Sequence, residues 1–231
     1  MGRGAILFDF GGTLDSDGLC WKDRFYPIYL RQGLNASSED FSKAFYDTDD
    51  HLPFRYRLEG LGLEETLRLH VRSVLTVLAP KNMDLTERIV QPFLYESRDS
   101  FRKAKPILER LKARYPLGIV SNFYGNLESI LEGEGLRSFF TVIADSSKVG
   151  FLKPAPEIFL YAMNRIGAGP AQTWMIGDSL RRDMKGAETL GLSHVWLRAN
   201  RDDETPPCCD QGKVVNSLEE VEFCLGSPAL A

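Results

Sequence analysis

Cysteine is scarce in this chain, which has four cysteines among 231 residues. They form no Cys-x-x-Cys pair, and the adjacent Cys208 and Cys209 have no nearby histidine or further cysteine at metal-ligand spacing. Cysteines this few and this scattered do not make a disulfide scaffold. We therefore expect reduced thiols, as in a cytoplasmic protein.

The chain also lacks an excess of positive charge and a long apolar run. Lysine and arginine number 28 against 32 acidic residues, which leaves a net charge of −4 and no basic cluster. A nucleic-acid partner would require such a cluster. No apolar stretch is long enough to cross a bilayer, and the first residues lack the apolar core of a signal peptide. We expect no nucleic-acid or membrane partner.

The remaining composition is ordinary for a globular protein. Hydrophobic residues make up 43% of the chain and charged residues 26%, which leaves enough apolar surface for a core. A chain of 231 residues is long enough for one α/β domain, or for a core domain with a smaller inserted module.

Helical periodicity dominates residues 16–103. Apolar side chains recur on one helical face, for example at Leu67, Val71 and Val74. Four such amphipathic segments follow one another, at residues 21–32, 38–49, 63–78 and 85–102. This pattern predicts an all-helical, four-helix cap domain at residues 16–103, inserted directly after the first strand.

The rest of the chain alternates between strand and helix. After the apolar run before Asp9, further strands are expected at residues 117–120, 142–144, 174–176, 195–197 and 214–215, and helices at 106–115, 127–133, 155–166 and 182–190. Such alternation predicts an α/β core domain, made of residues 1–15 and 104–231. Its fold would be a Rossmann-like parallel sheet with helices on both faces. Ligands of such sheets bind at the carboxyl ends of the strands.

Residues able to carry chemistry follow these apolar runs at four places. They are Asp9 with Gly11, Gly12 and Thr13; Ser121 with Asn122; Lys153; and Asp178 with Asp183. Each group stands at a predicted strand end or just after one, so all four can converge on one site. Any one of them alone would be an ordinary turn, cap or surface lysine.

The order and spacing of these groups resemble the haloacid dehalogenase superfamily, whose hydrolases are mostly phosphatases. The resemblance implies that Asp9 is the nucleophile, helped by Lys153 and Ser121. Phosphate would be held by Ser121, Asn122, Lys153 and the amide of Gly12. A Mg²⁺ ion, bound by Asp9, Gly11 through its carbonyl, Asp178 and Asp183, would offset the repulsion between a carboxylate and a dianionic phosphate.

The sequence departs from the family pattern at Gly11, where family phosphatases have a second aspartate. That aspartate protonates the leaving group and then activates water, and such acid–base help is worth about 10² to 10⁴ in rate. Some superfamily phosphatases look similar, with Asp-x-Gly at this place. Asp15 or Asp17 could substitute through a water molecule.

Three functions are open at this point. The first is a Mg²⁺-dependent phosphatase that acts on a small phosphorylated metabolite, as a monomer or homodimer. The second is another hydrolase of the same fold: haloacid dehalogenases also lack the second aspartate, and phosphonatases use a cap lysine, for which Lys22 and Lys43 are available. The third is a regulatory protein that keeps a phosphate pocket.

Substrate specificity is expected from the cap, which can close over the site and exclude water. The basic, aromatic turn at residues 53–57 contains Arg55 and Arg57 and is the best cap candidate for meeting an anionic substrate. Tyr124 could border the leaving group, because it follows Ser121 and Asn122 closely. Trp21 is more typical of core packing.

Overall fold

The computed structural model describes residues 4–199 and 212–225 of the chain. Cys208 and Cys209 lie outside these residues. Six parallel strands form one sheet in the order β3-β2-β1-β4-β5-β6. Their bounds are β1 Ala5–Phe8, β2 Leu117–Ser121, β3 Val142–Asp145, β4 Thr173–Gly177, β5 Ser193–Leu197 and β6 Gly212–Val215. The α/β class predicted from the strand–helix alternation is therefore confirmed.

The first strand lies in the middle of the sheet. β1 pairs with β2 on one side and with β4 on the other, so that Ile6 lies between Leu117 and Trp174. All four of its residues are buried. A continuous apolar run is what a parallel strand covered on both faces requires. This central place brings the end of β1 close to the ends of β2 and β4.

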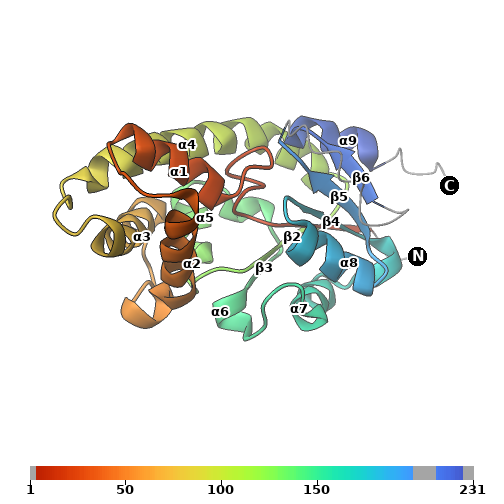
Figure 1. Cartoon of the computed structure of the whole chain (residues 1–231). Helices are drawn as coiled ribbons and strands as arrows, with labels where there is room; N and C mark the ends of the chain where they lie inside the picture. The colour runs from red at the N-terminus through yellow and green to blue at the C-terminus, as the bar shows by residue number, and fades with distance from the viewer. Residues whose placement is uncertain (1–3, 200–211, 226–231) are drawn as a thin grey trace.

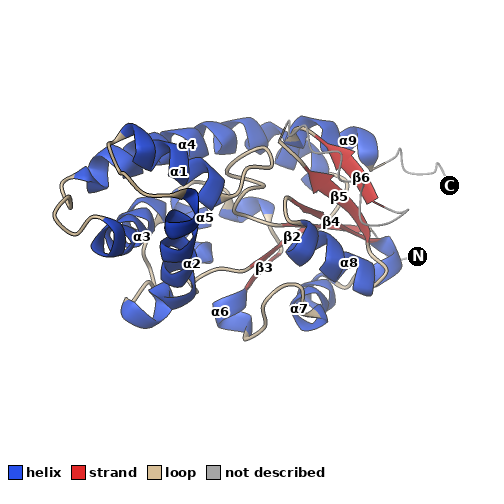
Figure 2. Cartoon of the chain, in the orientation of Figure 1, coloured by secondary structure: helices blue, strands red, loops and turns tan. Residues whose placement is uncertain are grey.

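Helices cover both faces of the sheet. One face packs against a large apolar cluster to which β1 contributes Ile6 and Phe8, and the other face against a smaller cluster that includes Leu7 and Phe159. The helices of the core are α5 Leu127–Gly133, α6 Ser146–Val149, α7 Pro156–Ile166, α8 Lys185–Thr189 and α9 Val221–Cys224. Figure 2 shows the strands between these layers.

Four helices lie between β1 and β2 in the sequence. They are α1 Trp21–Arg31, α2 Ser38–Arg55, α3 Leu63–Leu78 and α4 Leu85–Lys112. We call them the inserted helices. In Figure 1, α1, α2 and α3 gather at the side opposite to β5 and β6. The helical pattern of residues 16–103 is thus observed, while the borders of the two predicted domains stay a prediction.

The fourth inserted helix is longer than predicted. The segments expected at residues 85–102 and 106–115 form one helix, α4, which continues through Pro106. Its buried face runs on from Phe101 through Ile107 to Leu111 without a break. This apolar stripe offsets the backbone hydrogen bond that a proline inside a helix removes. No helix of the described ranges is long and apolar enough to span a membrane.

Candidate active site

Asp9 lies at the end of β1, where the chain leaves the sheet. It is 8% exposed, and its Oδ1 atom receives hydrogen bonds of 2.7 Å from the backbone amide of Phe10 and from the hydroxyl of Ser121. The ammonium group of Lys153 lies 2.7 Å from the same oxygen. Two hydrogen bonds and one ion pair therefore hold one carboxylate oxygen of Asp9 in a fixed orientation.

Glycine is required at position 12, because the loop after β1 passes very close to Asp178 there. Gly12 has a φ of +87°, and a Cβ atom there would lie 2.5 Å from a carboxylate oxygen of Asp178. Only glycine fits this backbone conformation and this distance. The loop after β1 can therefore pass directly against the carboxylate that follows β4.

Lys153 is the cation at the centre of the site. Its ammonium group lies 2.7 Å from Asp9 and 2.6 Å from Asp183, and its side chain is 1% exposed. The charges of Asp183 and Asp9 outweigh burial and raise the pKa of Lys153, so it stays protonated. The side chain of Asn122 fixes the lysine backbone by accepting from its amide at 2.7 Å and donating to its carbonyl at 3.1 Å. Any contact of Asn122 with phosphate is thus left to its backbone.

Asp178 and Asp183 complete an acidic cluster with Asp9. Each of the three offers a carboxylate oxygen, and these atoms lie within 4.8 Å of one another. Burial raises the pKa of Asp178 well above its usual range, and the charges of Asp9 and Asp183 add to the effect. Burial also raises the pKa of Asp183 to about 6, against the charge of Lys153. Three carboxylates facing one lysine leave an excess of negative charge in a buried place.

This donor set fits a hard divalent cation. Carboxylate oxygens at short mutual distance are the ligands that Mg²⁺ prefers, and a cation would offset their repulsion. Asp9, Asp178 and Asp183 could hold it together with the carbonyl of Gly11. Asp183 is partly engaged already, because it accepts from the amide of Ser179 at 3.0 Å and pairs with Lys153.

Trp21 packs against Gly11, the position at which the family pattern has a second aspartate. A Cβ atom on Gly11 would lie 3.2 Å from the indole nitrogen of Trp21. That nitrogen donates to the carboxylate of Asp15 at 2.6 Å, and the ring packs edge-on against Phe93 and Phe123. Trp21 is core-packed, as expected, but it also occupies the space beside Gly11 in the loop after β1. No local pattern in the sequence indicates this second role.

Asp15 ties the loop after β1 to the inserted helices. It is fully buried and accepts from the amide of Gly12 at 2.7 Å, from Trp21, and from the guanidinium of Arg24 at 2.7 Å. These bonds leave it unsuited to proton transfer through water. The other proposed substitute, Asp17, accepts from the amide of Leu218 at 2.9 Å.

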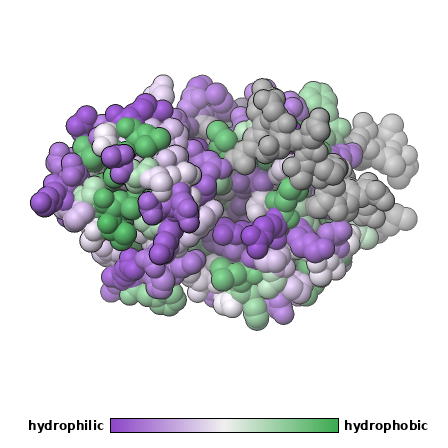
Figure 3. All heavy atoms as spheres, viewed as in Figure 1, coloured by the Kyte–Doolittle hydropathy of each residue, from purple (hydrophilic) through white to green (hydrophobic). Residues whose placement is uncertain are grey.

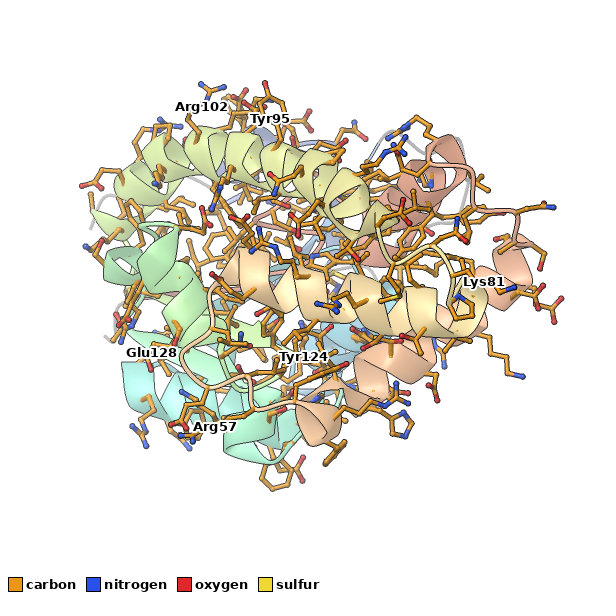
Figure 4. All side chains as sticks on the ribbon, turned by 90° about the vertical axis from the view of Figure 1, so that its left-hand side faces the viewer. Arg57, Lys81, Tyr95, Arg102, Tyr124 and Glu128 are labelled. Carbon is orange, nitrogen blue, oxygen red and sulfur yellow. The ribbon has the colours of Figure 1, made fainter. Side chains whose placement is uncertain are left out.

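The two arginines of the basic turn at residues 53–57 form ion pairs at the surface. Arg55 pairs with Asp47 at 3.1 Å, and Arg57 pairs with Glu59 at 3.1 Å with its side chain 87% exposed. Figure 4 views the side of the inserted helices and labels Arg57 and Tyr124. Each arginine thus has an acidic partner of its own.

A different polar group of the inserted helices meets the core. Asp49 of α2 accepts a short hydrogen bond from the hydroxyl of Tyr124, which follows β2. His70 of α3 is fully buried between aromatic rings, with its Nε2 atom 3.7 Å from Asp49. Burial lowers the pKa of His70 to about 3, so the ring is neutral. On the face seen in Figure 3, hydrophilic side chains predominate between the regions of α2 and α8.

The two lysines considered for Schiff-base chemistry lack a suitable environment. Lys22 pairs with Asp23 at 2.8 Å, and this hydrogen bond raises the lysine pKa. Lys43 is exposed on α2. A lysine nucleophile needs a lowered pKa, which desolvation or a neighbouring cation provides. Neither lysine therefore supports a phosphonatase-type reaction.

Comparison with known proteins gives one consistent family. Residues 4–191 match the family of haloacid dehalogenase-like hydrolases. The chain is 43% identical over 114 residues to haloacid dehalogenase-like hydrolase domain-containing protein 3 of Bos taurus, covering 49% of this chain and 44% of that protein. It is 32% identical over 124 residues to pyrimidine 5'-nucleotidase YjjG of Escherichia coli, covering 53% and 55%. The match thus spans about half the length of these two relatives.

A longer match is found with phosphoserine phosphatase of Thermus thermophilus, which is 28% identical over 212 residues, covering 82% of this chain and 85% of that protein. Among solved structures, a magnesium-bound hydrolase, YfnB of Bacillus subtilis, superposes with a TM-score of 0.57 at 22% identity, covering 97% and 99% of the two chains. A dehalogenase superposes with a TM-score of 0.65 at 20% identity, covering 97% and 98%. These structures share the fold of this chain.

Proposed function

The chain belongs to the haloacid dehalogenase-like hydrolases, and we propose that it is a Mg²⁺-dependent phosphatase of a small phosphorylated metabolite. The observation that carries this proposal is the cluster of Asp9, Asp178 and Asp183 around the buried Lys153. Such an excess of carboxylates, two of them buried and Asp178 half-buried, is costly unless a cation compensates it. The similarity to a nucleotidase and to a phosphoserine phosphatase supports the same reaction class.

Asp9 is the proposed nucleophile. Its Oδ1 atom is held by Phe10, Ser121 and Lys153, so we assign the attack to Oδ2. This oxygen forms a bond to phosphorus while the bond to the leaving oxygen breaks, which gives an aspartyl-phosphate. Water then attacks the phosphorus, releases phosphate and restores the carboxylate. Mg²⁺, when bound, would supply charge neutralisation for a phosphate held against three carboxylates.

Lys153 and Ser121 are also proposed to bind the phosphoryl group in this reaction. Both contact the Oδ1 atom of Asp9, so both can also donate a hydrogen bond to a phosphoryl oxygen beside that atom. The amide of Asn122 is a further proposed donor. The amide of Gly12, expected from the sequence to hold phosphate, already donates to Asp15 at 2.7 Å. Because Gly11 provides no acid, we expect esters with good leaving groups to react fastest.

The proposal is tested by phosphate release from an activated aryl phosphate and from a panel of sugar phosphates and nucleotides. Release is expected with Mg²⁺, loss of release with a chelator, and recovery when Mg²⁺ is added back. The recovery step is the control, since it separates metal removal from damage to the protein. Release that is indifferent to the chelator would contradict the metal requirement.

A dehalogenase is the second candidate, and the observation that favours it is Gly11. Halide release from a 2-haloacid, measured beside phosphate release on the same protein, separates the two reactions. Halide without phosphate would establish the dehalogenase. Neither product from a folded protein would indicate a protein that binds phosphate without turning it over.

Substituting Gly11 with aspartate is expected to lower activity rather than restore an acid. The added Cβ would press on Trp21, which cannot move away easily because Asp15 and aromatic rings hold it. The new carboxylate would also lie in the neighbourhood of buried Asp15. We expect a loss of about 1–3 kcal/mol in unfolding free energy, typical of overpacking, and at least roughly tenfold lower kcat/KM.

The matched control is Gly11→Ala, which adds the Cβ without the charge. A smaller loss in Gly11→Ala than in Gly11→Asp would separate the steric effect from the electrostatic effect. Thermal melting and aryl phosphate kinetics of both variants measure this. Faster turnover by Gly11→Asp would mean that position 11 still faces the leaving group.

A further inference from the structure

The segment that follows β2 is held from two sides. On the core side, the amide of Phe123 donates to the hydroxyl of Ser146 at 2.9 Å, and the amide of Gly125 donates to Asp145 at 2.9 Å. On the side of the inserted helices, Tyr124 and Asn126 make the contacts. We call residues 122–126 the bridging loop. It begins directly after Ser121, whose hydroxyl holds Asp9.

Two inserted helices contact the bridging loop. Tyr124 donates to Asp49 of α2. The side-chain amide of Asn126 donates to the hydroxyl of Thr66 in α3 at 2.7 Å and to the carbonyl of Leu61, just before α3, at 3.1 Å. Both helices are therefore fastened to the same short piece of core backbone, and Asn126 is 1% exposed.

The contact of Asn126 is buried, and the contact between Tyr124 and Asp49 is partly buried. Burial raises the pKa of Asp49, and it raises the pKa of Tyr124 well above its usual range. Arg182 and Asp50 are charged groups whose fields reach Asp49, and the Nε2 atom of the neutral His70 ring lies 3.7 Å from it. A hydrogen bond in such a place is stronger than at an open surface. Losing one partner leaves the other partly buried and without this hydrogen bond.

We propose that Tyr124 and Asn126 are positioning residues that couple the seating of α2 and α3 to the geometry of the phosphate site. The inference rests on the proposed phosphatase function. When the helices sit on the bridging loop, the loop holds Ser121 against Asp9, and Asn122 holds the backbone of Lys153. The contact of α2 and α3 with the bridging loop thereby positions these helices and the phosphate-binding groups together.

The test relies on a ligand that has no leaving group. Inorganic phosphate can occupy the site beside Asp9, and an effect of Tyr124 on its binding cannot come from a contact with a leaving group. In Tyr124→Phe, with Mg²⁺ present, calorimetry should show a roughly 3- to 10-fold higher Kd for phosphate, the effect of losing one hydrogen bond. A residue that only contacts the leaving group would not change this value.

Amide hydrogen exchange provides a second measurement that needs no ligand. Tyr124→Phe should exchange several-fold faster in residues 121–127 and in the second half of α2, with β5 unchanged. Asp49→Asn keeps an acceptor for the tyrosine hydroxyl and should show a smaller effect. The matched control is Tyr26→Phe, which removes a hydroxyl bond of 3.1 Å to the carbonyl of Ala36 within the inserted helices.

The possible outcomes separate the two proposals. Unchanged exchange in residues 121–127 and unchanged phosphate affinity in Tyr124→Phe would overturn the coupling. A raised KM for large substrates alone would overturn it too, because Tyr124 would then contact the leaving group. If the wild-type protein binds no phosphate but the exchange changes occur, the coupling stands and the phosphatase function fails.

Discussion

Asp9→Asn is expected to lower phosphate release at least about 10⁴-fold, the order of loss known for removal of a covalent nucleophile. An amide oxygen cannot form the aspartyl-phosphate, although asparagine keeps the shape of the side chain and can accept from Ser121. The measurement is phosphate release with Mg²⁺, together with intact-mass detection of the phosphorylated protein after acid quenching. The phosphorylated species should form in the wild type alone.

Stability distinguishes this loss from unfolding. Asp9 shares its buried site with Asp178 and Asp183 against a single lysine, so neutralising it relieves repulsion. The melting temperature of Asp9→Asn in a chelator should therefore equal or exceed that of the wild type. Asp84→Asn, a change at an exposed carboxylate before α4, is the matched control and should leave both activity and melting unchanged. Turnover above about a tenth of the wild type in Asp9→Asn would exclude Asp9 as nucleophile.

Lys153→Met should reduce both activity and stability. The substitution removes the lysine that lies between Asp9 and Asp183 and leaves these buried carboxylates without their ion pairs to it. Breaking a buried ion pair in this way costs about 3–5 kcal/mol, and losing a charge aimed at the phosphoryl group costs about 10²–10³ in kcat. Chemical denaturation without divalent cations and aryl phosphate kinetics with Mg²⁺ measure the two effects.

The loss of stability in Lys153→Met should depend on pH. Burial already raises the pKa of Asp183 to about 6, and without the lysine this pKa rises further. A carboxyl whose folded pKa exceeds its unfolded pKa contributes stability that is fully present below the unfolded pKa and is lost as pH rises from there through the folded pKa. The variant should therefore be destabilised less at about pH 5 than at about pH 8.

Lys148→Met is the matched control, because Lys148 is exposed on α6, five residues before Lys153. It should unfold like the wild type at both pH values. A Lys153→Met protein as stable and as active as this control would show that Lys153 does not neutralise the site. Equal destabilisation at both pH values would contradict the proposed titration of the freed carboxylates.

The sheet and the meeting of the polar groups could be predicted from local pattern. Short apolar runs such as residues 5–8 and 117–121 are buried on both faces, which requires a parallel sheet between helices. Parallel strands place their carboxyl ends at one edge, so Asp9, Ser121 and Asp178 had to approach one another. The helix Leu63–Leu78 was equally predictable, since its 3.6-residue periodicity marks one buried face.

The partners of these groups depend on contacts between residues far apart in the chain. Nothing near Gly11 in the sequence indicates that Trp21 fills the space beside it, or that Arg24 reaches across to Ser97 and neutralises Asp15. A periodic pattern identifies which face of a helix is buried, but not what lies against it. The bond between Tyr124 and Asp49, separated by 75 residues, forms because packing brings α2 onto the loop after β2.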